Sequence, residues 1–197
     1  LDIIKDRLYT SKKDSVERRA AQTAMYEILS VLVRILAPMT CFTAEEIWKF
    51  MPHRAGENTE SVMLEYYPKV NPSYENEAIA LKWEKLIKIK DEVAKKLEVA
   101  RANKEIGLSL AAKVTLFVEG DEYEFLKGEE DLLKEIFIVS DVEGQENRRN
   151  ADEEVSIGVK VEVAEGEKCE RCWMISKTVG QDPDHPTICH RCAENIK

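Results

Sequence analysis

The sequence predicts a mainly α-helical protein, in which a helical bundle is followed by a small α+β domain that ends in a four-cysteine zinc finger. Three observations support this fold class. Apolar residues recur every three or four positions through the first half of the chain, which is typical of packed helices. From Leu108 the apolar period changes to two, which indicates strands. Close to the end, two Cys-x-x-Cys pairs have the spacing of a zinc site.

The bundle is expected to span residues 1–75. Residues 1–9 carry apolar side chains on one face and resemble the end of a helix whose start lies before this sequence. Residues 16–36 repeat apolar side chains over several turns, and Pro38 ends this second helix because it cannot continue the backbone hydrogen bonds.

A short helix is expected after this point. Thr43 and Glu46 have the spacing of a capping box, in which each side chain accepts a hydrogen bond from a free backbone N–H, and Pro52 stops the helix. Residues 53–73 contain proline, glycine and many polar residues, so a long connection is expected there.

A long connecting helix is predicted over residues 76–104. Its apolar residues alternate at spacings of four and three, and the resulting seam contains one lysine, Lys90. This pattern fits either a coiled coil or a single helix packed on the rest of the fold. The packed helix is favoured because four heptads would be the whole length of the coil.

Residues 105–165 are expected to form the α+β domain. Alternating apolar residues predict strands at 114–118 and 155–163. Between them lie a helical stretch, 122–134, and an apolar run, 136–139.

Residues 166–197 are expected to form a zinc-binding domain, with Cys169, Cys172, Cys189 and Cys192 as ligands. Two sulfurs three positions apart on a tight turn reach one ion together, and a second such turn completes a tetrahedral shell. Because four thiolates leave no position open for water, the zinc is expected to be structural. Its binding energy, on the order of 10 kcal/mol, replaces the core that so short a segment cannot build.

Disulfides or a redox dithiol are the alternative interpretations of these cysteines. No secretory signal or membrane span is visible, so a cytoplasmic protein with reduced thiols is expected. Both pairs flank a polar loop rather than opening a helix after a strand, unlike a thioredoxin-type motif. His185 could replace a cysteine as a ligand, and the fifth cysteine, Cys41, is expected to be a buried spectator thiol.

The net charge of −9 argues against indiscriminate binding to nucleic acid, but the charge is unevenly distributed. Residues 82–104 contain eight Lys or Arg against four Asp or Glu, whereas residues 119–168 contain seventeen acidic and six basic residues. The chain shows no glycine-rich phosphate loop and no nucleophile with a matched base. No catalytic site is therefore expected within it.

Several segments together resemble the bacterial isoleucyl-tRNA synthetases. They are LDIIKDRLY (1–9), ERRAA (17–21), LAPMTCFTAEEIW (36–48), SVMLEYYP (61–68), LKWEKLIKIKDEV (81–93), and CERCW with HPTICHRC (169–192). The resemblance implies a C-terminal fragment of an ATP-dependent, class I isoleucine–tRNA ligase that acts in protein biosynthesis. The HIGH and KMSKS signatures of the catalytic domain do not occur in this sequence.

The resemblance also implies partners and cofactors. The fragment would be an anticodon-binding domain that binds isoleucine tRNA, with one structural zinc ion, while ATP and Mg would be needed only by the full-length enzyme. It would be monomeric and would have no membrane partner.

An anticodon loop offers unstacked bases and phosphates, which call for aromatic or guanidinium planes and for positive charge. The candidates for RNA contact are Trp173, Arg171, Arg191, Lys177 and His190 near the zinc ligands, and Lys5, Arg7, Arg18 and Arg19 in the bundle. Alternatively, Arg171 and Arg191 only offset the charge of the zinc centre, and Trp173 only covers a small core.

Two rival functions remain. Formamidopyrimidine-DNA glycosylases end in a zinc finger of the same spacing, although the helical bundle of residues 1–104 does not resemble the rest of such an enzyme. The second rival function is that of a zinc-binding interaction module without any RNA partner.

Overall fold

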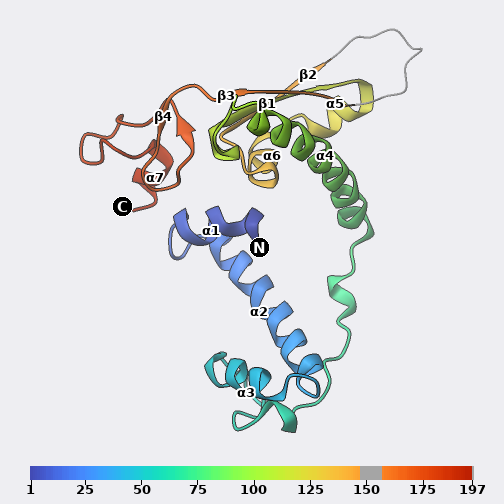
Figure 1. Ribbon diagram of the computed structural model, residues 1–197. Coiled ribbons are helices and arrows are strands. Elements are labelled where there is room, and N and C mark those ends of the chain that lie inside the picture. Colours follow the sequence, from blue (N-terminus) through green and yellow to red (C-terminus); the bar gives the residue numbers. More distant parts are fainter. Residues whose placement is uncertain (147–156, 197) are drawn as a thin grey trace. The chain divides into compact units, whose positions relative to one another are not determined.

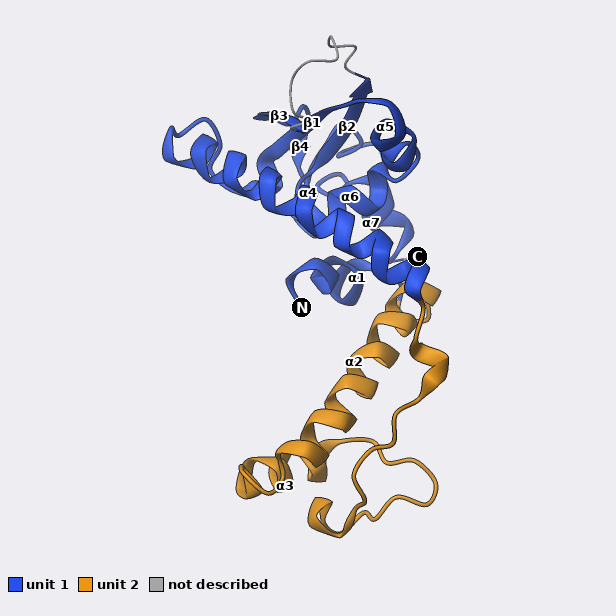
Figure 2. Ribbon diagram, turned by 90° about the vertical axis from the view of Figure 1, so that its right-hand side faces the viewer, with its two compact units in different colours: residues 1–12, 77–197 blue, residues 13–76 orange. Residues whose placement is uncertain are grey.

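The computed structural model describes residues 1–146 and 157–196, and the chain divides into two compact units (Figures 1 and 2). Unit 2 is Lys13–Asn76, and unit 1 combines Leu1–Lys12 with Glu77–Lys197. Unit 2 is therefore inserted between two segments of unit 1. Each unit has its own hydrophobic core.

Unit 2 consists of two helices and a long ordered connection. Helix α2 spans Val16–Leu36, and the side chain of Ser15 caps its start by accepting a hydrogen bond from the Arg18 backbone N–H at 3.3 Å. Helix α3 spans Cys41–Phe50, and 3₁₀ turns follow at Val62–Leu64 and Pro72–Tyr74.

The core of unit 2 is small and centres on Trp48 of α3. The buried residues are Val33, Ala37, Ala44, Trp48, Met51 and Val62. Trp48 is 1% exposed, and its indole N–H donates to the Asn58 carbonyl oxygen at 2.9 Å. The indole thereby satisfies its only donor while filling the centre of the core.

A charged network orders the connection after α3. The Arg34 guanidinium of α2 lies 2.5 Å from the Glu57 carboxylate and 3.7 Å from that of Glu65, and it also lies 5.3 Å from the centre of the Trp48 ring. Glu57 in turn accepts from the Arg54 backbone N–H at 2.7 Å. The Arg34 side chain is only 14% exposed, and the two carboxylates compensate its charge away from water, which fixes the loop on α2.

Unit 1 is built around a three-stranded sheet of order β2-β1-β3. Its elements are α4 (Glu77–Ala102), a 3₁₀ turn (Ser109–Ala111), β1 (Ala112–Val118), α5 (Gly120–Leu126), α6 (Glu130–Phe137), β2 (Asp141–Glu146) and β3 (Gly158–Val163). Strand β1 is parallel to β2, with α5 and α6 in the connection, and antiparallel to β3. Alternate residues of β1, among them Val114, Leu116 and Val118, form one core with residues of α4, α5 and α6.

The N-terminal segment belongs to unit 1. It comprises a 3₁₀ turn, Asp2–Ile4, and helix α1, Lys5–Thr10. Ile3 packs against the sheet core, and the Arg7 guanidinium donates to the Glu135 carboxylate of α6 at 2.8 Å. These contacts group residues 1–12 with residues 77–197 in unit 1.

The expected helices 16–36 and 76–104 are confirmed as α2 and, with shorter ends, α4. The capping box at Thr43 is wrong, because α3 already begins at Cys41. The stretch 122–134 forms parts of two helices, α5 and α6.

The mainly helical fold class, with a small sheet region and a cysteine cluster, is confirmed. Strand β3 confirms most of the strand expected at 155–163, whose first two residues lie outside the described part of the chain. Within residues 1–146 and 157–196, no helix has the length and apolar character needed to cross a membrane.

We predict that Trp48→Ala destabilises unit 2 by about 3–5 kcal/mol, because it leaves a cavity at the centre of a small core. Hydrogen exchange should show lost protection of amides in α2 and α3, with β1 unchanged. Phe50→Ala is the matched control, since Phe50 lies on the same helix but is 74% exposed. Equal loss of protection in β1 would contradict the separation of the two cores.

Candidate metal centre and nucleic-acid interface

The first cysteine pair lies in a hairpin turn. Strands β4 (Glu167–Lys168) and β5 (Ile175–Ser176) pair antiparallel, and the turn between them contains Cys169 and Cys172. The Cys169 backbone N–H donates to the Met174 carbonyl oxygen, and the Trp173 N–H donates to the Cys169 carbonyl oxygen, both at 2.9 Å. These bonds close the turn and direct both sulfurs to one side.

Gly166 makes this hairpin possible. Its φ is +123°, and a Cβ atom at this position would lie 2.4 Å from the Ser176 backbone carbon. Only a residue without a side chain fits a positive φ and such a close approach.

The second cysteine pair stands at the start of helix α7, His190–Glu194. Cys189 is the N-cap residue, and its carbonyl oxygen accepts from the Ala193 N–H at 3.0 Å. Cys192 lies in the helix and is fully buried. The Cys189 backbone N–H also donates to the Cys169 sulfur at 3.3 Å, which joins the two pairs.

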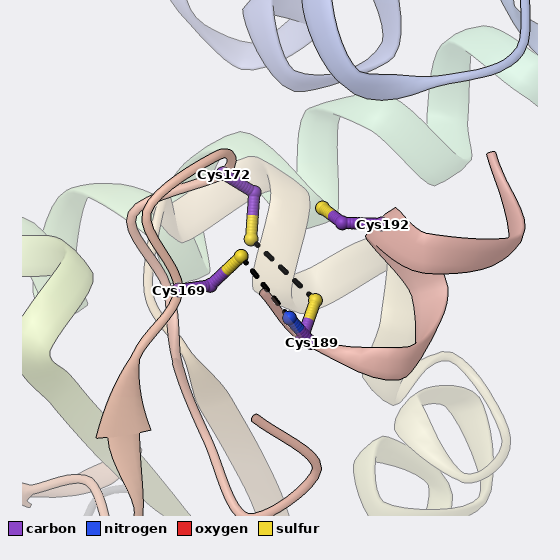
Figure 3. A group of neighbouring side chains, drawn as sticks. All are labelled: Cys169, Cys172, Cys189 and Cys192. Atoms are coloured by element: carbon purple, nitrogen blue, oxygen red, sulfur yellow. Dashed lines mark hydrogen bonds between the residues drawn. The ribbon is translucent and has the colours of Figure 1, made fainter. Parts of the chain in front are cut away.

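The four sulfurs converge, as Figure 3 shows. All lie within 4.8 Å of one another, and the sulfurs of Cys172 and Cys189 are 3.8 Å apart. A regular tetrahedron with Zn–S bonds of about 2.3 Å has sulfur–sulfur edges of about 3.8 Å. Disulfide bonding requires about 2.05 Å, and all four cysteines are free. The donor set and its spacing therefore fit one structural zinc ion.

The chemistry of the cysteine thiols also fits a cation. The neighbouring Cys192 thiol, together with burial, raises the pKa of Cys172 to about 12. Four crowded thiols of this kind hold several negative charges only when a positive ion compensates them. Among the described residues, no other group of this kind could hold a metal ion, and His185 does not belong to the group. Cys41 is exposed at the start of α3, so the expectation that it is buried is wrong.

Trp173 follows the first cysteine pair and is 59% exposed. Its φ of +65° places a bulky residue in the left-handed region, which costs roughly 1–2 kcal/mol relative to an ordinary conformation. The Lys168 ammonium lies 5.5 Å from the centre of its ring. Trp173 is not among the residues packed in the small core of the zinc finger, which comprises Cys169, Ile188, Cys189, Cys192 and Ala193 with Cys172 and Val179 beside them.

The three arginine candidates of unit 1 have partners within that unit. Arg171 donates to the Thr10 carbonyl oxygen at 2.6 Å, and Arg191 donates to both Asp6 carboxylate oxygens at 2.5 and 3.0 Å. Arg7 pairs with Glu135, as described above. Burial acts to raise the pKa of Asp6, but the hydrogen bonds and charge of Arg191 outweigh it, so the pKa is lowered.

Among the remaining candidates, Lys177, His190, Lys5 and Arg19 are exposed and Arg18 is partly buried. Lys177 pairs with Glu165, His190 Nε2 lies 3.4 Å from a Glu194 oxygen, and Lys5 Nζ lies 2.7 Å from an Asp2 oxygen. Arg19 donates to the Gln22 side chain at 3.0 Å, and Arg18 lies beside it at the start of α2. Lys5 and Arg7 belong to unit 1, whereas Arg18 and Arg19 belong to unit 2.

A cavity of about 1000 Å³ lies within unit 1. Its lining comes from α1, from the turn between α6 and β2, and from the hairpin that carries the first cysteine pair; Lys5, Tyr9, Ser140, Arg171 and Trp173 are among its residues. The Ser140 hydroxyl anchors the hairpin, because it accepts from the Ile175 N–H at 2.6 Å and donates to the Leu110 carbonyl oxygen. Neither the cavity nor these anchors could be read from the sequence.

We expect Cys169→Ser or Cys189→Ser to weaken zinc binding by about 100-fold, since one of four thiolates contributes about a quarter of roughly 12 kcal/mol. Zinc content and competition with a chromogenic chelator measure the effect. Cys41→Ser is the control, because Cys41 lies in unit 2 and outside the cluster. Retention of wild-type zinc affinity in both ligand variants would overturn the ligand assignment.

Gly166→Ala should destabilise the zinc finger by on the order of 3 kcal/mol, because the added methyl group meets the Ser176 backbone at a positive φ. Thermal unfolding, monitored through the release of zinc, would report this loss of stability. Gly107→Ala is the control, since a Cβ there meets nothing within 4 Å. Equal unfolding temperatures for the two variants would contradict the role of Gly166.

Comparisons with known proteins agree with this organisation. Residues 1–116 match the family model described as "Anticodon-binding domain of tRNA ligase", and residues 166–195 match "Zinc finger found in FPG and IleRS". All of the chain aligns with proteins named isoleucine–tRNA ligase, at 48% identity in Caldanaerobacter subterraneus subsp. tengcongensis and 49% in Thermoanaerobacter sp. (strain X514) and in Desulforamulus reducens.

The chain spans 22% of the length of these relatives. The family match covers more than half of the chain and confirms the resemblance seen in the sequence. The chain belongs to the family of anticodon-binding domains of tRNA ligases.

Proposed function

We propose that this chain is the C-terminal, tRNA-binding part of an isoleucine–tRNA ligase, and that its partner is isoleucine tRNA. The observation that carries this proposal is the combination on one chain of the anticodon-binding family match with a zinc finger of the type named for isoleucyl-tRNA synthetase. The whole enzyme would use ATP and Mg to attach isoleucine to the tRNA, and this part would hold the tRNA. We propose a monomer for the enzyme.

The surface of unit 2 supports membership in a longer protein. Helix α2 buries one face but carries a second apolar stripe, Ile28, Leu32 and Ile35, at 41–61% exposure. Their spacing of three and four places them on one side of the helix. Apolar stripes of this kind are normally covered by packing against other residues. The relatives are more than four times as long as this chain, so they have further residues that could cover the stripe.

The zinc finger supports a direct role in RNA binding for Trp173. An exposed indole in a strained left-handed conformation is costly to maintain, and such strain is concentrated at functional positions. Single-stranded RNA bases stack on aromatic faces, each worth about 1–3 kcal/mol. Trp173 also lines the cavity of unit 1 together with Lys5 and Tyr9, so a splayed base that stacks there would meet both α1 and the zinc finger.

Positive charge adds to this contact. Lys168 lies over the indole, and Lys177 and His190 are exposed on the same zinc finger. Arg18 and Arg19 would contribute from the start of α2 in unit 2. The overall charge of −9 means that attraction to phosphates is local, so affinity would depend on salt through a few contacts only.

We retain four functional segments within this proposal: the bundle at 1–75, the connecting helix at 76–104, the junction domain at 105–165 and the zinc finger at 166–197. The DNA glycosylase alternative shares the finger type, as the name of the matched model indicates. It is disfavoured because residues 1–116 match the tRNA-ligase domain.

The experiment compares binding of the zinc-loaded chain to isoleucine tRNA, to a tRNA with a different anticodon and to a DNA duplex, at several salt concentrations. Trp173→Gly should lower affinity for isoleucine tRNA by about tenfold or more through loss of stacking. Its zinc affinity and unfolding temperature should stay equal or rise, because glycine adopts φ of +65° without strain.

Trp173→Phe is the matched control, since it keeps an aromatic face at the same strained position. It should retain most of the affinity. Equal binding to all three nucleic acids, or unchanged affinity of Trp173→Gly, would contradict the proposed role of the zinc finger in tRNA recognition.

A further inference from the structure

The Asp6 carboxylate occupies an unexpected position for a site that binds RNA. It lies on α1, lines the same cavity as Trp173, and would repel a nearby phosphate. Both of its oxygens accept hydrogen bonds from Arg191 at 2.5 and 3.0 Å, and the Thr10 hydroxyl donates to one of them at 2.9 Å. A carboxylate that accepts this many hydrogen bonds from its own chain holds two parts of the protein together and does not bind a polyanion.

Helix α1 cannot be stable by itself. It has six residues, and isolated helices of this length do not form in water. Its last residue, Thr10, is buried, and the carbonyl oxygen of Thr10 accepts from Arg171 at 2.6 Å. The guanidinium thus satisfies a carbonyl that the helix end leaves free, and its charge suits the negative end of the helix dipole.

Both cysteine pairs contribute to holding α1. Arg171 directly precedes Cys172, and Arg191 directly precedes Cys192, so each zinc-binding turn supplies one guanidinium to the same helix. Each arginine is placed by the cysteine that follows it, and bound zinc would fix both cysteines.

We propose that Asp6 and Arg191 are positioning residues, which hold helix α1 on the zinc finger so that α1 and Trp173 line one cavity. This inference rests on the proposed function of that site in tRNA binding. Asp6 acts on RNA through the placement of α1 and not by contact. Zinc binding and tRNA binding are then coupled, because loss of the metal releases Arg191 and with it α1.

Asp6→Asn in the zinc-loaded full chain tests the proposal by the sign of its effect. The substitution removes a negative charge and frees Arg191. If Arg191 contacted RNA directly, tRNA binding would therefore be unchanged or tighter. Positioning predicts the opposite, a loss of affinity for isoleucine tRNA of about fivefold. Asp6→Glu, which can still pair with Arg191, should restore most of the affinity.

Asp2→Asn is the matched control. It makes the same charge change four positions earlier, where Asp2 is largely exposed and pairs with Lys5. Its tRNA affinity should be unchanged or higher. Loss of affinity equal to that of Asp6→Asn would overturn the proposal.

Hydrogen exchange of the amides of residues 5–10 provides the second measurement. Asp6→Asn and removal of zinc should each increase exchange there, while Asp2→Asn should not. Unchanged exchange in Asp6→Asn would overturn the proposal even if affinity fell. If the wild-type chain binds no tRNA, the proposed function fails, and the exchange data alone decide whether the pair positions α1.

Discussion

Convergence of four cysteine sulfurs on one point is the constraint on which the C-terminal part of this structure depends. The zinc finger has a core of only a few residues, among them Ile188 and Ala193, which is too small to hold its loops by burial alone. The ion replaces that core. By holding the two cysteine turns, the ion would also fix the directions of the residues next to its ligands, namely Trp173, Arg171 and Arg191.

Local patterns in the sequence are sufficient for part of this architecture. The cysteines are recognisable because each pair is three residues apart, and α2 because its apolar spacing continues over 21 residues without a break. Strand β2 could not be predicted, because its residues are mostly polar and it becomes a strand by pairing with β1. Its apolar content is largely limited to Val142, which faces the core.

Long-range pairings are the part that the sequence could not reveal. Asp6 and Arg191 are 185 residues apart, and no pattern around either residue indicates the other. Their charge made Arg171 and Arg191 candidates for RNA contact. The same charge explains why Arg171 instead binds the Thr10 carbonyl oxygen and Arg191 the Asp6 carboxylate. Residues 1–12 could not be assigned to unit 1 from their own sequence for the same reason, since their helical pattern fits a bundle equally well.

The discontinuity of unit 1 has a consequence for synthesis on the ribosome. Unit 2 is contiguous, so it can fold as soon as Asn76 has left the exit tunnel, whereas α1 must wait first for Glu135 of α6 and then for Arg171 and Arg191 near the end of the chain. At about 5–20 residues per second, the 185 residues that separate Asp6 from Arg191 take roughly 10 to 40 s to synthesise. During that interval α1 lacks its Arg191 partner, and Cys192, which directly follows Arg191, completes the cysteine cluster at the same time as the contact of α1 with it.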